Sequence, residues 1–217
     1  MSDLNMQLVR EFFELRLFHV LTHWQHEGLL PRTADTTSLL FVEHTSPEAG
    51  RAPDFVLAAE EVPRIHRAVV EVRAWHADRF YPSVIENSSA LSHIADSETR
   101  QLAQAVFGND DFTSILVLSE LPASHDPRAR AVQLLRDRGI GHIIEFPTLL
   151  RDMVERVSAH GNYAPSQSLQ TMRILKRYNL IRRQQLEFAF ATEAPVLTTA
   201  PSVHVQTEAP EQDDEAE

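Results

Sequence analysis

Two short apolar runs, each beside an acidic residue, constrain the fold more than any other part of the sequence. Residues 55–59 follow Asp54, and residues 68–75 contain Glu71. Both runs have the length and β-branched content of strands, and the polar residues between them predict a hairpin. Side chains alternate across a strand, so Glu71 and Arg73 should share one face. Such charges need an ion pair, a metal or an open edge, because an unpaired buried charge is very unfavourable.

Helical and strand patterns follow one another in a regular order along the chain. A broad apolar stripe with helical spacing predicts a first helix over residues 5–25, with Gly28 after its end. The other expected elements are strands over residues 38–44, 55–59, 68–75, 113–118 and 141–146, and helices over residues 91–107, 128–138 and 147–159. The expected fold class is α/β, a mixed central sheet flanked by helices, in the order α-β-β-β-α-β-α-β-α.

The two acids also suggest a family. Pro53 and Asp54, with Glu71-Val72-Arg73 beginning seventeen positions after Asp54, resemble the PD-(D/E)xK signature of the restriction-endonuclease-like nuclease superfamily. Arginine stands here where that family usually has lysine. In the family the motif lies on the second and third strands of a core ordered helix, three-strand meander, helix, strand. The resemblance therefore implies a restriction-endonuclease-like domain over residues 1–160.

The resemblance implies a divalent-metal-dependent nuclease, with Asp54 and Glu71 as ligands of Mg²⁺ or Mn²⁺. The substrate would be DNA or RNA, with DNA favoured, and the pathway by family analogy would be repair, restriction or phage defence. Arg73 would clamp a phosphate oxygen but could not act as a base, because arginine stays protonated. Glu14 on the first helix is a further catalytic candidate, and a solvated helix face is the alternative for it.

A second interpretation of the same residues is non-catalytic. An ion pair of Arg73 with Glu71 or Asp54 would replace the metal and leave a degenerate nuclease core. Such a subunit would bind nucleic acid or a partner protein, and a homodimer is also possible.

Several histidines are candidates for ligands or proton carriers. His19, His23 and His26 have the i, i+4, i+7 spacing of one helix face. Two histidines one turn apart suit zinc, but no acid of the HExxH kind lies between them and no further ligand beyond Glu27 is evident. A structural role near the end of the first helix is therefore the favoured interpretation. His66 and His76 flank the third predicted strand and are expected to be surface or packing residues.

The charge is distributed unevenly. Residues 189–217 contain seven acids and no Lys or Arg, so the rest of the chain has 20 basic and 24 acidic residues, a net charge of −4 instead of −11. This tail is expected to be disordered. Residues 161–188 form a basic segment with a helix predicted over 166–178. Its candidate phosphate contacts are Arg173, Lys176, Arg177, Arg182 and Arg183.

Length and composition exclude several classes. A chain of 217 residues without cysteine has no disulfide, thiolate zinc site or cysteine nucleophile. No apolar run approaches the roughly twenty residues that span a bilayer. We therefore expect a cytoplasmic protein that does not engage a membrane.

Overall fold

The computed structural model describes residues 3–22, 38–77, 79–88, 91 and 93–181. Its central feature is a five-stranded sheet with the order β1-β2-β3-β4-β5. The strands are β1 (Phe18–Thr22), β2 (Leu39–His44), β3 (Arg67–Arg73), β4 (Thr113–Leu118) and β5 (His142–Glu145). The first three are antiparallel neighbours, whereas β3, β4 and β5 run parallel. The prediction of an α/β fold with a mixed central sheet is confirmed.

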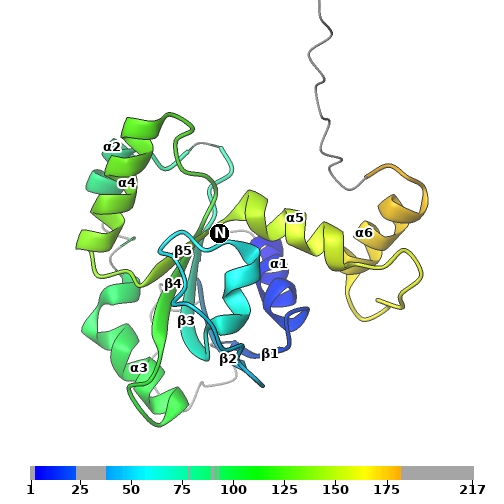
Figure 1. Cartoon of the computed structure of the whole chain (residues 1–217), viewed down its shortest axis with the longest axis horizontal. Coiled ribbons are helices and arrows are strands. Elements are labelled where there is room, and N and C mark those ends of the chain that lie inside the picture. The colour runs from blue at the N-terminus through cyan, green and yellow to red at the C-terminus, as the bar shows by residue number, and fades with distance from the viewer. Residues whose placement is uncertain (1–2, 23–37, 78, 89–90, 92, 182–217) are drawn as a thin grey trace, which may run out of the picture. The chain divides into compact units, whose positions relative to one another are not determined.

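Helices cover both faces of the sheet (Figure 1). One face packs against α1 (Asp3–Glu14), η3 (Ala59–Arg64) and α5 (Phe146–Arg156). Helix α6 (Gln167–Arg177) lies against α1 and α5 instead of the sheet (Figure 1). The other face packs against α2 (Pro82–Asn87), η5 (His93–Ala95), α3 (Ser97–Phe107) and α4 (His125–Asp137). None of the helices in the described ranges is long and apolar enough to cross a bilayer.

Strand alternation decides which face each residue of β3 serves. Val70 and Val72 join the core beneath α1 and α5, while Val69 joins the core beneath α2, α3 and α4. Glu71 has the same parity as Val69, so it points toward the second core. The predicted placement of Glu71 on the face opposite to Val70, Val72 and Ala74 is confirmed.

The first helix is shorter than predicted, because the chain turns and starts a strand. Helix α1 ends at Glu14, and Leu17 adopts a left-handed φ of 66° before β1 begins at Phe18. Phe18 packs edge-on against Phe13 at 5.2 Å, which folds the strand back onto the helix. The prediction of one helix over residues 5–25 was therefore wrong: residues 18–22 are the first strand of the meander.

The predicted strand over residues 55–59 is not part of the meander. Val56 instead forms a parallel bridge with Ile143 of β5, and the N–H of Leu57 donates to the carbonyl of Ile143 at 2.9 Å. This short segment extends the sheet at its opposite edge, and η3 begins at Ala59. The proposed hairpin of residues 55–59 with residues 68–75 is wrong, because β2 is the antiparallel partner of β3.

The order α-β-β-β-α-β-α-β-α nevertheless holds for the main elements. The meander consists of β1, β2 and β3, so β1 supplies the strand that was expected from residues 55–59. Strand β4 has the predicted bounds, and α3 and α4 differ from prediction only at their ends. The short helix α2 was not predicted. A buried ion pair joins the turn after α1 to α5, because Arg16 Nη2 lies 2.5 Å from Asp152 Oδ1.

Candidate functional site

The structure does not bring the two predicted metal ligands together. Asp54 lies in the loop before residues 55–57, with a side chain that is 65% exposed and 3.5 Å from Arg51. Glu71 lies on β3 and is completely buried. Strands β4 and β5 separate β3 from residues 55–57, so three inter-strand spacings, roughly 14 Å, divide the two segments. The predicted pairing of Asp54 with Glu71 is therefore wrong.

Two basic side chains, those of Arg73 and His93, lie against the Glu71 carboxylate. Arg73 Nε donates to Glu71 Oε1 at 2.7 Å, and Arg73 Nη2 lies 2.5 Å from the same oxygen. His93, from η5, places Nδ1 at 3.7 Å from this oxygen. Burial raises the pKa of Glu71 above its ordinary value, and the charge of Arg73 only partly offsets that effect. The carboxylate is thus held by its own neighbours.

Glu14, the further catalytic candidate, does not approach this cluster. It lies on α1, which covers the face of the sheet opposite to that of Glu71. Its carboxylate accepts a hydrogen bond from Arg10 Nε at 2.7 Å, one helical turn away on the protein surface. The alternative interpretation, a solvated helix face, describes this residue.

The described residues do not fit a divalent metal at the predicted position. Mg²⁺ needs several oxygen ligands around a hydrated centre, whereas Glu71 has no exposed surface and Asp54 lies at another edge. Within the described ranges, no three His, Asp or Glu side chains are grouped closely enough to hold a metal ion. We therefore derive no catalytic step through Mg²⁺ or Mn²⁺ at these residues.

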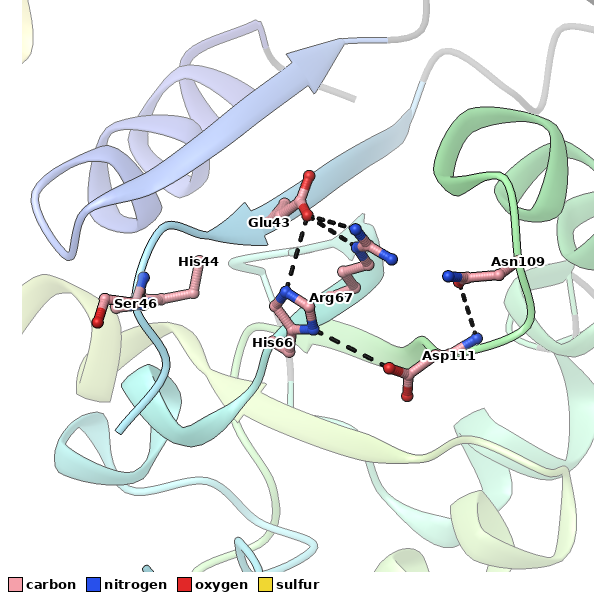
Figure 2. Close-up of polar contacts among 7 residues, drawn as sticks. All are labelled: Glu43, His44, Ser46, His66, Arg67, Asn109 and Asp111. Atoms are coloured by element: carbon pink, nitrogen blue, oxygen red, sulfur yellow. Dashed lines mark hydrogen bonds and ion pairs between the residues drawn. The ribbon is translucent and has the colours of Figure 1, made fainter. Parts of the chain in front are cut away.

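His66 belongs to a separate polar cluster at the start of β3. Figure 2 shows its ring between Glu43 and Asp111, at 3.7 Å from Nε2 and 4.0 Å from Nδ1 respectively. Because the two carboxylates face different ring nitrogens, they do not share one coordination centre. Arg67 donates two further hydrogen bonds to Glu43. The cluster joins β2, β3 and the turn after α3 as a surface network, as expected for a packing histidine.

The other histidines are also placed by the fold. His19 is an exposed residue of β1, so the helical spacing that grouped it with His23 and His26 does not apply to it. His23 and His26 lie outside the described residues. His76 follows β3, and its Nε2 is 3.1 Å from Asn5 Oδ1.

In the basic segment, Lys176 has a structural role. Its Nζ donates to the carbonyl oxygens of Val154 at 2.7 Å and Val157 at 2.5 Å. These oxygens belong to the end of α5, where carbonyl groups lack partners within the helix and a cation is favourable. Lys176 therefore caps the end of α5 and holds α6 against it, instead of pointing to solvent as the predicted phosphate contact would.

The remaining cations of this segment differ in exposure. Arg177 is exposed beside Tyr178, whose relative exposure is 68%, whereas Arg173 is half-buried. The sequence offers Ser166 or Ser168 as the cap of α6, and the structure selects Ser166, whose side chain accepts a hydrogen bond from the N–H of Leu169. Leu180 follows the helix and is 70% exposed, although its spacing from Leu169 and Met172 predicts an inward position. Arg182, Arg183 and the acidic tail lie beyond the described residues.

Two groups around these sites had no signal in the sequence. His93 reaches Glu71 from a single turn of 3₁₀ helix, twenty-two positions later in the chain. Glu11 accepts a hydrogen bond from Ser166 Oγ at 2.5 Å and another from Ser168, which anchors the start of α6 on α1. Neither contact follows from local spacing, because each joins segments that only the tertiary fold brings together.

Comparisons with protein-family models, curated proteins and solved structures find no match to this chain. Its functional interpretation therefore depends on its own geometry.

Proposed function

We propose that this chain is a restriction-endonuclease-like domain that binds nucleic acid without cleaving it. The order of its elements supports the first part of the proposal. A helix precedes an antiparallel three-strand meander, and a helix and a parallel strand follow. Glu71 and Arg73 lie on the third strand, where the resemblance places the second half of its signature.

The buried ion pair between Glu71 and Arg73 is the main support for the absence of cleavage in this proposal. A catalytic carboxylate must reach a hydrated metal and a phosphate. Glu71 is instead fully buried, and both contacts from Arg73 fall on one of its oxygens. An internal cation thus takes the place that the metal would have in an active site.

The end of α6 supports nucleic acid as the binding partner. Arg177 and Tyr178 are neighbouring exposed residues, in a stretch over 157–186 that contains five Lys and Arg residues and no acid. Exposed arginine neutralises phosphate, and an exposed aromatic ring stacks on a base. An exposed arginine beside an exposed aromatic ring supplies the two simplest contacts to a single nucleic-acid strand, one to a phosphate and one to a base.

A cleavage assay tests the catalytic half. The purified chain with Mg²⁺ or Mn²⁺ should leave single- and double-stranded DNA and RNA intact, and Arg73→Lys should not introduce cutting. Metal-dependent cutting that is abolished by Glu71→Ala would show an active nuclease instead.

A binding assay tests the other half. Fluorescence anisotropy with labelled DNA and RNA strands should detect binding that weakens steeply with added salt. The double variant Arg177→Ala, Tyr178→Ala should bind about tenfold or more weakly. Arg130→Ala is the matched control, since Arg130 is also an exposed arginine but lies on α4, paired with Glu86 at 2.7 Å. Equal binding by all three proteins would refute the α6 contact.

A further inference from the structure

A cavity of about 510 Å³ lies at the carboxyl ends of the three parallel strands. Its walls come from the segments that leave β3, β4 and β5. The lining residues used below are His76, Arg79, Tyr81, Glu120, Phe146 and Leu150. In open α/β sheets this edge is where ligands commonly bind, and the volume suits one small molecule. Of the side chains that the sequence singled out, His76 lines this cavity, whereas none of the predicted metal ligands or phosphate contacts does.

The cavity has an apolar wall and a polar rim. Phe146, Pro147 and Leu150 of α5 form the wall, and Phe146 is 3% exposed. His76, Arg79 and Tyr81 contribute ring nitrogens, a guanidinium and a phenol to the rim. More of the lining surface is polar than apolar, which suits a charged ligand that also has an apolar part.

The imidazole of His76 is held in one orientation. Asn5 Nδ2 donates to the carbonyl of Ala74 at 2.9 Å, which directs Asn5 Oδ1 toward the ring. His76 therefore donates its Nε2–H to that oxygen, and Nδ1 is the nitrogen left for a ligand. The ring also packs edge-on against Phe146, with centroids 4.6 Å apart. This histidine is fixed by the fold although it is exposed.

The Arg79 side of the rim is equally well positioned. Arg79 Nε donates to Glu120 Oε2 at 2.9 Å, and the N–H of Phe80 donates to the carbonyl of Glu120 at 2.7 Å. Phe80 is buried and stacks against Trp75, with centroids 5.1 Å apart and planes inclined by 13°. The segment after β3 is thus tied to the end of β4, which sets the guanidinium at the mouth of the cavity.

We propose that this cavity binds a nucleoside monophosphate group, with the phosphate at Arg79 and His76 and the base against Pro147 and Leu150. Arginine binds phosphate through paired N–H donors, and histidine adds a further donor when it is protonated. Pro147 and Leu150 are partly exposed in the lining, and apolar side chains of this kind accept the flat face of a base. Because Glu120 already balances part of the charge of Arg79, the rim suits one phosphate group and not a triphosphate.

This group has two possible sources, a free nucleotide and the phosphorylated 5′ end of a strand. The proposal does not depend on binding by α6, because neither Arg177 nor Tyr178 lines the cavity. Variants of those two residues should leave binding in the cavity unchanged.

Isothermal titration calorimetry of the full chain provides the test. The probes are AMP, GMP, CMP and UMP, inorganic phosphate, and one oligonucleotide with and without a 5′ phosphate. We expect one equivalent of a monophosphate probe to bind more tightly than inorganic phosphate. Arg79→Gln and Leu150→Trp, which respectively remove the guanidinium and fill the wall, should each lower the affinity about tenfold or more. Arg130→Gln is the control, an exposed arginine of α4 that also pairs with a glutamate.

The outcomes distinguish a free nucleotide from the 5′ end of a strand, and both from a site that binds no monophosphate. Binding of the 5′-phosphorylated oligonucleotide but not of free nucleotides would assign the ligand to strand ends and support the site. The proposal is overturned if no monophosphate probe binds, if the 5′ phosphate makes no difference and free nucleotides do not bind, or if Arg79→Gln binds as the native chain does. Arg79→Gln keeps the test decisive even if Leu150→Trp folds poorly, because Arg79 is a surface residue.

Discussion

Two arginine–glutamate pairs begin within eight positions of each other along the chain and have opposite environments. Glu71 and Arg73 meet on β3 with side-chain exposures of 0% and 14%, whereas Arg79 and Glu120 meet at the cavity rim with exposures of 45% and 43%. The nitrogen–oxygen distances are similar, 2.5 Å and 2.9 Å. Distance therefore does not distinguish the two pairs, and burial does.

Burial changes what each pair contributes. Removing two charges from water costs several kcal/mol per ion in real proteins, and a buried pair offsets this only while both partners are present. At the surface, water solvates each charge separately and the pair contributes little. The buried pair therefore keeps Glu71 bound to Arg73 inside the protein. The pair at the cavity rim holds Arg79 in water, where an anionic ligand can compete with Glu120.

The largest expected effect is from breaking the buried pair. Glu71→Ala leaves Arg73 without its carboxylate inside the protein, so the free energy of unfolding should fall by about 3–5 kcal/mol. Denaturant unfolding followed by circular dichroism measures it. Glu120→Ala, which breaks the surface pair, should show no change outside experimental error. Equal losses in the two variants would remove the distinction drawn here.

A smaller effect should follow from replacing both buried charges. Glu71→Leu combined with Arg73→Met removes the two desolvated groups together and keeps much of their volume. The double variant should lie within about 1–2 kcal/mol of the native chain, far above Glu71→Ala. The same unfolding experiment measures this recovery. A double variant as unstable as the single one would mean that packing, and not charge, explains the loss.

The pH dependence of the buried pair gives a third test. Burial raises the pKa of Glu71 above its ordinary value of 4.5. At pH values between 4.5 and the raised pKa, the folded chain therefore binds a proton at Glu71 more readily than the unfolded chain does. The stability that this proton contributes is complete below pH 4.5 and is lost as the pH rises through the raised pKa. Relative to Glu71→Gln, the native chain should thus gain stability as the pH is lowered toward 4.5. A difference that does not vary with pH would contradict a raised pKa.

The smallest effect should be at the rim. Arg79→Gln should leave the thermal unfolding midpoint unchanged, and added salt should not alter the comparison, since water solvates both charges in the native chain and the remaining Glu120 charge in the variant. Differential scanning fluorimetry at low and high salt checks this. A clear destabilisation would indicate that Arg79 is needed for folding and would weaken its assignment to a ligand.

Local patterns predicted much of the sheet. The apolar run of β4 was placed at its observed bounds, and the alternation in β3 correctly set Glu71 and Arg73 apart from Val70 and Val72. The ion pair between these two charges was one of the alternatives for them. Each of these inferences needs only the period of two residues that a strand imposes on its side chains.

The first strand was missed for the converse reason. Residues 18–22 continue an apolar pattern that also fits a helix, and no Gly or Pro marks the turn at Leu17. Residues 18–22 form a strand because Phe18 packs on Phe13 and β1 pairs with β2, and both of these are tertiary contacts. Short apolar runs of this kind do not distinguish the two states by periodicity.

The sequence by itself determined the fold class, the order of the main elements and the shared face of Glu71 and Arg73, because each follows from spacing along the chain. Only the tertiary structure decided that Asp54 joins the edge of β5, that Lys176 caps α5, and that His76 and Arg79 meet at one cavity. Strand partners and side-chain neighbours are chosen among segments far apart in sequence, and a local pattern carries no information about which segment is chosen.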